Sequence, residues 1–375
     1  MPNELHGSFD LAIIGAGSAG FAAAIKAAEL GARVALIEGG TLGGTCVNVG
    51  CVPSKTLIRA AEAQYRRTHH PFEGIAKSDG APDWADVRMQ KDALVSSLRQ
   101  SKYWDVLRAY DSITLFQQRA TLTTGHDAQL GDGRSVAAEG LIVTTGSSPW
   151  LPPIPGLAEA SPLDNAAAMA LDRLPASMIV IGGSAVGVEL AQMFARLGVA
   201  ITILEALSHL VPSEDSEIGV GLADHLRSEG LEIHVGVSIT GVESDRASRT
   251  VTFRDQDGEA HSVRAERVLV ATGRRANTKG FGLEAAGVKL GTKREVVVDE
   301  FLATSNPRIY AAGDVLGDPM FVYVAAYAGA VAAENALSGN VRRYDITAVP
   351  RVTFSDPAVA SVGLTDEEAR RRGLE

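Results

Sequence analysis

One supersecondary unit occurs twice in the chain and constrains the fold more than any other feature of the sequence. The first copy has a strand at 11–14, the turn Gly15-Ala16-Gly17-Ser18-Ala19-Gly20, a helix ending near residue 31 and a strand ending at Glu38. The second has a strand at 178–181, the turn Gly182-Gly183-Ser184-Ala185-Val186-Gly187, a helix ending near residue 198 and a strand ending at Glu205. The repeat predicts an α/β protein with two doubly wound, three-layer Rossmann-like domains.

Each copy has the context that a dinucleotide-binding turn requires. It follows a strand, opens a helix and places an acid 23 positions after its first glycine, close to the ~20 residues typical of such sites. A pyrophosphate would rest on the helix N-terminus, and the acid would accept hydrogen bonds from ribose hydroxyls. We therefore expect Gly15, Gly17, Gly20 and Glu38 at one cofactor, and Gly182, Gly187 and Glu205 at another. Ser184 replaces the middle glycine of the second copy and would crowd its phosphate.

The only two cysteines, Cys46 and Cys51, lie in the stretch Gly43-Gly44-Thr45-Cys46-Val47-Asn48-Val49-Gly50-Cys51-Val52-Pro53-Ser54-Lys55. Pro53 suits the first turn of a helix, whose free N–H groups and positive end favour a thiolate at the second cysteine. Lys55 adds a positive charge within a turn. Buried cysteines usually pack as small apolar residues, but two in one Gly-rich loop predict a redox pair.

Composition restricts the class of protein. The chain has 375 residues, 46% of them hydrophobic, and a net charge of −10, which argues against nucleic acid or an anionic membrane as the main partner. Residues 1–7 lack the pattern of a signal peptide, and no 18-residue apolar stretch free of charges occurs. Two cysteines do not make a secreted disulfide framework. We expect a cytoplasmic protein.

Other landmarks organise the rest of the chain. Thr145-Gly146 and Thr272-Gly273 each end an apolar strand, and Asp314 follows another strand after Gly313. Periodicity predicts helices over 54–67 and 84–107, and alternation predicts antiparallel strands and turns over 115–143. Pro152, Pro153 and Pro155 mark one domain crossing, and residues 273–277 mark a second.

These motifs together resemble the FAD-dependent pyridine nucleotide-disulfide oxidoreductases, a family that includes dihydrolipoamide dehydrogenases, glutathione reductases and mercuric reductases. The resemblance covers nearly the whole chain. Within the family, the sequence is most similar to those of the mercuric reductases. The similarity lies in the cysteine block and in the runs Ile58-Arg59-Ala60-Ala61, Pro71-Phe72-Glu73-Gly74-Ile75 and Phe321-Val322-Tyr323-Val324-Ala325-Ala326.

The resemblance implies four segments: an FAD-binding domain in 1–150, an inserted NAD(P)-binding domain in 151–273, a second part of the FAD-binding domain in 274–345, and the start of an α+β dimerisation domain in 346–375. It also implies which residues contact the two cofactors. Those implied for FAD are Gly15, Gly17, Gly20, Glu38, Gly40, Gly44, Thr45, Lys55, Ala120, Gly146, Asp314 and Val322. Those implied for the nicotinamide cofactor are Gly182, Gly187, Glu205 and Gly273.

The resemblance further implies an order of electron transfer, from NAD(P)H through FAD to a Cys46–Cys51 disulfide. Cys51 would lie against the flavin and Cys46 would face the substrate, with Lys55 paired to Glu189 near the flavin. Two thiolates form a soft site for transient binding of Hg(II), whose two-electron reduction to Hg(0) needs no proton donor. We therefore expect a mercury(II) reductase that serves mercury detoxification.

Two alternatives remain open at this point. A dithiol enzyme of dihydrolipoamide dehydrogenase type would need a general acid, usually His, for the departing thiol. A flavin-binding or soft-metal-binding protein without turnover would use the thiol pair to sense or sequester. The C-terminal sequence discriminates between the enzymes, because a terminal cysteine pair favours mercury and a His-Glu pair favours dithiol exchange.

Relatives continue for about 100 residues beyond the segment that resembles 350–375, on the usual scale of a domain. That part forms their dimer interface, so we expect this chain to be a fragment of a homodimeric protein, a poor dimer by itself and slow to turn over. Glu205 should repel a 2′-phosphate, and no arginine follows it before Pro212. The sequence thus predicts a bias toward NADH.

Overall fold

The computed structural model describes residues 9–78, 80–124 and 127–374. Residues 1–7, the segment without a signal-peptide pattern, lie outside the described residues. The chain divides into two compact units, one formed by Met1–Cys51, Leu94–Ser148 and Arg274–Thr347, the other by Val52–Ala93, Pro149–Gly273 and Ala348–Glu375. The assignment of FAD and the nicotinamide cofactor to separate domains stays a prediction.

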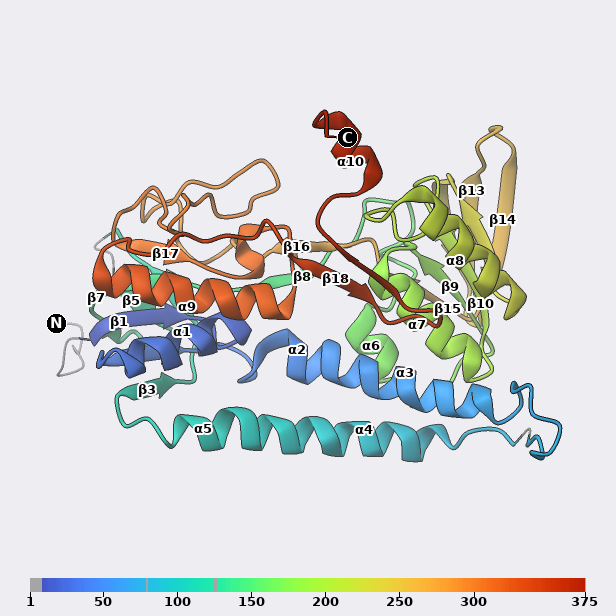
Figure 1. Ribbon diagram of the computed structural model, residues 1–375, viewed down its shortest axis with the longest axis horizontal. Helices are drawn as coiled ribbons and strands as arrows, with labels where there is room; N and C mark the ends of the chain where they lie inside the picture. The colour runs from blue at the N-terminus through green and yellow to red at the C-terminus, as the bar shows by residue number, and fades with distance from the viewer. Residues whose placement is uncertain (1–8, 79, 125–126, 375) are drawn as a thin grey trace. The chain divides into compact units, whose positions relative to one another are not determined.

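The first unit is built on a five-stranded parallel sheet (Figure 1). Its order is β17 (Ile309–Ala311), β7 (Ala138–Val143), β1 (Phe9–Ile14), β2 (Val34–Ile37) and β3 (Ile113–Phe116). Strand β1 pairs with both β2 and β7, with Ile14 opposite Ile37 on one side and Val143 on the other. Parallel central strands are buried on both faces, and every residue of β2 is buried.

Alternate side chains of this sheet enter two different cores. Leu11, Ile13 and Leu36 pack with the helices α1 (Ser18–Glu29) and α9 (Val322–Ser338). Ala12, Ile14 and Ile37 pack with the antiparallel strands β4 (Ala120–Leu122), β5 (Ala128–Leu130) and β6 (Ser135–Val136). The period of two along each strand therefore produces three layers.

The second unit repeats this plan. Its parallel sheet has the order β11 (Glu232–Val235), β10 (Ala200–Glu205), β9 (Ser177–Ile181) and β15 (Arg267–Val270). One core contains α7 (Ala185–Arg196) and α8 (Ser216–Ser228). The other contains residues of the antiparallel strands β12 (Ser238–Ser244), β13 (Arg249–Arg254) and β14 (Ala260–Ala265). The predicted α/β class with two Rossmann-like units is confirmed.

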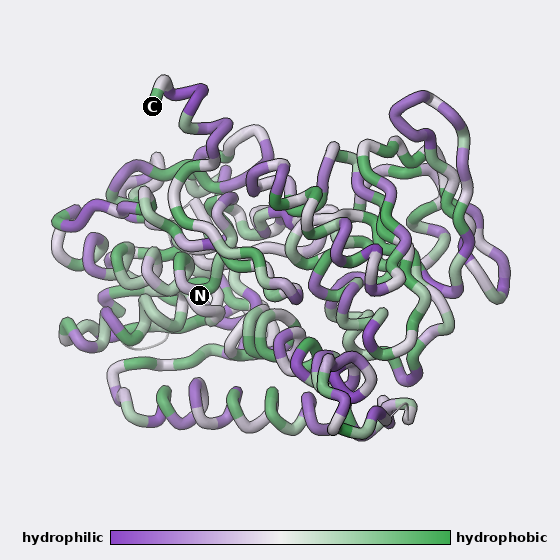
Figure 2. Tube along the Cα trace, turned by 45° about the vertical axis from the view of Figure 1, so that its right-hand side comes forward, coloured by the Kyte–Doolittle hydropathy of each residue, from purple (hydrophilic) through white to green (hydrophobic). Residues whose placement is uncertain are grey.

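The remaining elements connect or extend these layers. They are α2 (Gly44–Val49), α3 (Cys51–Arg66), α4 (Trp84–Arg99), η1 (Gln100–Trp104), α5 (Asp105–Leu107), β8 (Ser147–Pro149), α6 (Asn165–Met169), β16 (Arg274–Ala276), η2 (Asp314–Leu316), β18 (Pro350–Thr353), β19 (Val359–Val362) and α10 (Asp366–Arg371). In Figure 2, α4 alternates between hydrophobic and hydrophilic residues, whereas α10 is hydrophilic. None of the described helices combines the length and apolar character that a membrane span requires.

Two expectations about local structure need refinement. The helix predicted over 84–107 contains a π-helical segment, η1, between α4 and α5. Among the described residues of the stretch predicted as antiparallel over 115–143, only β4, β5 and β6 are antiparallel. Its two ends belong to β3 and β7, which are parallel members of the main sheet. Alternation does not reveal strand direction, which depends on the partner that a strand meets.

Candidate functional site

The carboxyl ends of the parallel strands bring most of the predicted FAD residues to one edge of the first sheet. Gly15 follows β1, Glu38 follows β2, Gly146 follows β7 and Gly313 precedes Asp314 after β17. Ligands of open α/β sheets bind at this edge, because the turns to the next helices converge there. The other predicted members of the unit lie as follows: Gly17 and Gly20 at the start of α1, Gly40 and Gly44 before and in α2, Thr45 exposed on α2, Ala120 buried in β4 and Val322 at the start of α9.

Backbone crowding explains the glycines of the first turn. Gly15 has φ 107°, a conformation that side chains rarely adopt, and a Cβ there would overlap the carbonyl of Thr144. A Cβ on Gly20 would overlap the carbonyl of Gly15. At Gly17, in contrast, a Cβ would meet nothing nearer than the Cα of Gly44, 3.7 Å away. The fold therefore requires Gly15 and Gly20, whereas a Cβ on Gly17 would make only an ordinary van der Waals contact.

The second turn has nearly the same backbone. Gly182 has φ 109°, and a Cβ on Gly187 would overlap the carbonyl of Gly182. Ser184 is the N-cap of α7 in extended conformation, as Gly17 is for α1. The Ser184 residue is exposed. Gly273 (φ 103°) has no atom within 4 Å of its Cβ position, so the edge is open there as well.

Both terminal glutamates bind the turn that precedes them. Glu38 accepts hydrogen bonds from the N–H of Ala16 and of Gly40, each at 2.7 Å. Glu205 accepts from the N–H of Gly183 and, at 2.7 Å, of Leu207. Because a carboxylate has about four lone-pair sites, each side chain keeps capacity for a ribose hydroxyl.

The cysteine loop is attached to the first turn. The N–H of Gly43 donates to the carbonyl of Ala16 (3.0 Å), and a Cβ on Gly44 would lie 2.6 Å from the Cα of Gly17. Cys46 lies on α2 and Cys51 is the first residue of α3, and both are half-buried. Gly50 breaks the helix between them. Cys51 is thus placed in the first helical turn, where the partial positive charge favours a thiolate.

Asn48 and Arg99 hold the loop in shape, and the sequence analysis did not identify either residue. The amide of Asn48 donates to the carbonyls of Leu42 (3.0 Å) and Gly44 (2.8 Å). Arg99, at the end of α4, donates to the Asn48 Oδ1 at 3.0 Å. The position of Asn48 between the cysteines was the one available signal, because nothing in the sequence links α4 to this loop.

Tyr103 is a third residue that the sequence did not predict. It lies on the π-helical segment η1, its ring packs against Phe21 with centroids 4.6 Å apart, and it borders Gly43. Burial raises the pKa of the Tyr103 phenol, and the negative charges of Cys46 and Cys51 raise it further, although a hydrogen bond with Ser18 opposes them. The phenol therefore lies where a negative charge on either cysteine would oppose its ionisation.

Asp314 has a fixed orientation that the sequence did not predict. Ser147 donates to the Asp314 Oδ2 at 2.7 Å, and Arg274 donates to both the hydroxyl and the carbonyl of Ser147, each at 2.7 Å. Asp314 begins the short helix η2. Ser147 directly follows the predicted Thr145-Gly146 pair, which was the only sequence signal for its role.

Lys55 and Glu189 form an ion pair within the second unit. The Lys55 Nζ lies 2.6 Å from the Glu189 Oε2, and the Glu189 side chain is only 6% exposed. The other oxygen, Oε1, accepts the N–H of Phe354 at 2.9 Å. A buried carboxylate needs such partners, because an unpaired charge would carry a large desolvation cost. The family resemblance implied the pair but not the contact with Phe354.

The residues present fit the two cofactors. The turns before α1 and α7 are not crowded at these positions, because a Cβ on Gly17 would make only an ordinary contact, Ser184 is exposed and a Cβ on Gly273 would meet no atom within 4 Å. Each helix has 12 residues, enough for an anion site at its first turn. Glu38 and Asp314 offer acceptors at the first edge, and Glu205 offers one at the second. These are the donor and acceptor types that a dinucleotide requires.

Comparison with known proteins agrees with these features. The family model for pyridine nucleotide-disulphide oxidoreductase matches residues 9–329. The chain is 43% identical to the mercuric reductase of Staphylococcus aureus, covering 98% of this chain and 67% of that protein. It is 44% identical to the mercuric reductase of Streptomyces lividans, covering 99% and 79%.

Solved structures give the same result. The flavoprotein disulfide reductase RclA of Escherichia coli, in its Cu(II) complex, superposes with a TM-score of 0.84 at 30% identity, covering 96% of this chain and 79% of that one. The resemblance predicted from the cysteine block is therefore confirmed. The chain belongs to the pyridine nucleotide-disulphide oxidoreductase family.

Proposed function

We propose that the protein transfers two electrons from NAD(P)H, through FAD, to the Cys46–Cys51 pair and on to Hg(II), releasing Hg(0). The observation that carries the proposal is the cysteine loop seated on the first dinucleotide turn through Gly43 and Gly44. The similarity of the whole chain to several mercuric reductases, with 43% and 44% identity to two of them, supports mercury as the substrate. In balance, NAD(P)H loses a hydride, Hg(II) gains its two electrons, and its proton is released to solvent.

FAD, when bound, would accept the hydride and deliver the electron pair to the cysteines. The residues proposed to hold it are Gly15, Gly17, Gly20, Glu38, Gly40, Gly44, Thr45, Lys55, Ala120, Gly146, Asp314 and Val322. Gly182, Gly187, Glu205 and Gly273 would hold the nicotinamide cofactor. The helix N-terminus at Cys51 stabilises a thiolate, and the two thiolates would bind the soft metal ion before its reduction.

The decisive experiment measures NAD(P)H oxidation by the full-length protein with Hg(II) and excess thiol, together with the release of Hg(0) vapour. Cys46→Ala and Cys51→Ala should each lower the mercury-dependent rate at least 100-fold, as expected when a covalent or metal-binding partner is removed. Thr41→Ala, an exposed position before the same loop, should retain it. Full activity in either cysteine variant would exclude the mechanism.

A dithiol/disulfide oxidoreductase is the second candidate, and the disulfide reductase among the structural relatives favours it. The same preparation should be assayed with lipoamide and NADH. A rate with the dithiol substrate that exceeds the mercury rate would transfer the assignment to this candidate. A protein that binds FAD but turns over neither substrate would instead be a flavin-binding or metal-binding protein.

We also propose that the full-length protein is a homodimer that acts in the cytoplasm. The family resemblance supports the dimer, and the two-cysteine composition supports a reducing compartment. Sedimentation of the full-length protein measures its oligomeric state, and a monomer would contradict the proposed homodimer. Cell fractionation measures the second, and recovery in the periplasmic fraction would contradict it.

A further inference from the structure

The segment that follows β18 is held against α7 by side chains of that helix. Glu189, Gln192 and Arg196 are three and four positions apart, so they lie on one face of α7. They contact Phe354 and Asp356, two residues of this segment. All of these residues belong to the second unit.

Gln192 binds Asp356 as a neighbouring strand would. Its amide nitrogen donates to the Asp356 carbonyl at 2.7 Å, and its amide oxygen accepts the Asp356 N–H at 2.8 Å. Gln192 is only 4% exposed. Both backbone groups of Asp356 therefore find partners in a buried side chain, which fixes the position of this residue along α7.

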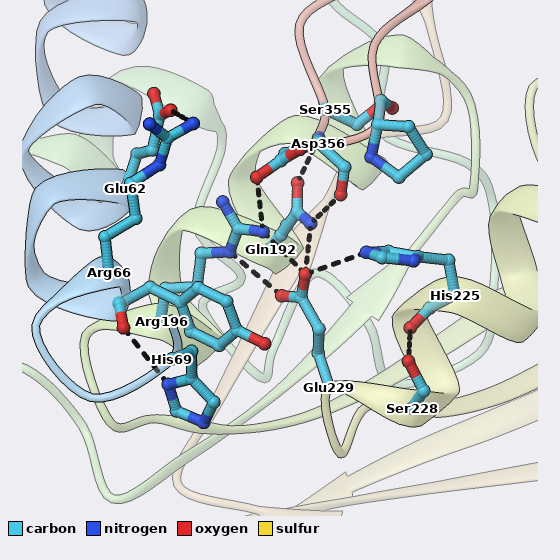
Figure 3. A network of polar contacts seen from close by, with 12 residues as sticks. Glu62, Arg66, His69, Gln192, Arg196, His225, Ser228, Glu229, Ser355 and Asp356 are labelled. Carbon is cyan, nitrogen blue, oxygen red and sulfur yellow. Dashed lines mark hydrogen bonds and ion pairs between the residues drawn. The ribbon is translucent and has the colours of Figure 1, made fainter. Parts of the chain in front are cut away.

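Arg196 and Glu229 complete this attachment, as Figure 3 shows. The guanidinium lies between the carboxylates of Glu229 and Asp356, with the Asp356 Oδ2 at 2.9 Å. Burial works against the charge of Arg196, but hydrogen bonds and charge attraction from the two carboxylates outweigh it and raise its pKa. We call Gln192, Arg196 and Glu229 the Asp356 anchor.

Phe354, two residues before Asp356, contacts both members of the ion pair. Its N–H donates to the Glu189 Oε1 at 2.9 Å, and the Lys55 Nζ lies 4.8 Å from the centroid of its ring. The ring attracts the ammonium through its negative face. Phe354 is 41% exposed, so apolar burial alone does not hold it in place.

Helix α3 is bound to α7 at a second point by the same anchor. The guanidinium of Arg196 lies over the Tyr65 ring, 4.4 Å from its centroid. Tyr65 and Lys55 both belong to α3, and Arg196 and Glu189 both belong to α7. The two helices thus meet through a cation–π contact and an ion pair. Asp356 binds Arg196 of the cation–π contact, and Phe354 contacts both members of the ion pair.

From these contacts we infer that Phe354 is a positioning residue for Lys55, and that the Asp356 anchor keeps Phe354 in place. Lys55 follows Cys51 by one turn of α3, so the two residues lie on the same face of that helix. The segment after β18 therefore sets the position of the charge that lies one helical turn after Cys51 in the chain. The inference rests on the proposed function only for the chemical role of Lys55.

The experiment uses the full-length protein and two readouts that need no mercury. The first is amide hydrogen exchange over 354–356. The second is the acylation rate of the Lys55 amine by an activated ester, measured by peptide mass spectrometry relative to the exposed Lys77. In the unaltered protein we expect slow exchange at Phe354, because its N–H donates to a buried carboxylate. Exchange there as fast as in an unstructured peptide would overturn the inference.

Two variants separate the contacts. Gln192→Leu removes both amide contacts to Asp356 and should raise the relative acylation rate of Lys55 at least threefold, with faster exchange over 354–356. Phe354→Leu keeps the backbone N–H but removes the ring. It should raise the relative acylation rate of Lys55 about twofold without changing amide hydrogen exchange at Asp356. The matched controls are Gln64→Leu, whose amide is hydrogen-bonded to Gly80 and Arg67, and Phe72→Leu, at a side chain that is 63% exposed.

Unchanged Lys55 acylation in Gln192→Leu, despite faster exchange over 354–356, would overturn the positioning role. Should one variant fail to fold, the other variant and the exchange of the unaltered protein still decide the question. If both readouts follow expectation but the protein reduces no Hg(II), the proposed function fails and the positioning role stands.

Discussion

The Glu38 carboxylate accepts a hydrogen bond from the N–H of Ala16 at 2.7 Å and so closes the first Gly-rich turn from the end of the next strand. Glu205 contacts the N–H of Gly183 in the same way. Each acid is therefore part of the architecture of its turn as well as a candidate acceptor for a ribose. A backbone amide at the turn and a hydroxyl of the cofactor would share one carboxylate.

Replacing Glu38 by Gln should affect both roles at once. The amide nitrogen of Gln cannot accept, so one of the two N–H groups loses its partner, at a cost of about 1–3 kcal/mol in folding free energy. We expect a lower unfolding midpoint and a lower flavin content of the purified protein, measured by absorbance. Glu205→Gln is the matched control, since it should leave the flavin content unchanged. A fully loaded Glu38→Gln variant of normal stability would contradict this account.

Gly17→Ala and Gly20→Ala should fail in different ways. A Cβ on Gly20 overlaps the Gly15 carbonyl, whereas one on Gly17 meets no atom nearer than 3.7 Å. Gly20→Ala should therefore lower the yield of folded protein, because the strand and the helix cannot approach. Gly17→Ala should fold, with a circular dichroism spectrum like that of the parent, yet bind flavin weakly because its methyl group occupies the space of the phosphate. Normal flavin affinity in Gly17→Ala would show that the pyrophosphate does not bind at this position.

Glu205 should set the choice of nicotinamide cofactor. Its side chain is buried and positioned by Gly183 and Leu207, so a 2′-phosphate would meet a negative charge. We expect kcat/KM to favour NADH in the full-length protein. Glu205→Gln should raise the NADPH to NADH ratio about tenfold, equivalent to about 1.4 kcal/mol. A clear preference of the parent protein for NADPH would refute the role of Glu205.

Tyr103 should report on the cysteines at alkaline pH. Burial, followed by the charge of Cys46, raises the pKa of its phenol. Because the folded pKa lies above the unfolded value of about 10, Tyr103 stabilises the fold fully below that value and loses this contribution as the pH rises through the folded pKa. The phenolate absorbance that the parent shows and Tyr103→Phe lacks should therefore appear at a higher pH than that of an ordinary tyrosine.

The control for this titration is Cys46→Ala. Both proteins are titrated under reductant, so that the cysteines of the parent are free thiols. Removing the negative charge of Cys46 should then bring the Tyr103 pKa down toward its ordinary value, while Tyr344, whose burial raises its pKa to about 12, should be unaffected. A Tyr103 titration that does not respond to Cys46→Ala would show that the phenol and the thiolate do not interact.

Much of the fold and part of the candidate site could be predicted from the sequence. Gly15 and Gly182 are required by a backbone with positive φ, and Gly20 and Gly187 by the close approach of strand and helix. Such constraints act over a few residues, so they leave a pattern that is visible locally. The family and the two Rossmann-like units follow from that pattern and were confirmed.

Other features had no local pattern to predict them. The π-helical segment that carries Tyr103 looks like an ordinary part of a long helix, and Ser147 and Arg274 carry no motif of their own. Their functions arise from contacts between segments more than 50 residues apart, such as Arg99 with Asn48, which are 51 positions apart. Chain connectivity does not determine such contacts, because they depend on how whole layers pack.

The sequence by itself determined the class of fold, the two Gly-rich turns and the identity of the thiol pair, since backbone sterics and helix periodicity act within each segment. Only the tertiary structure decided the surroundings of these groups. It placed the cysteine loop on the first turn, and it brought Phe354 to the Lys55–Glu189 pair across 165 positions of the chain from Glu189. A buried carboxylate must find its partners wherever the packed chain provides them, and that choice is made in three dimensions.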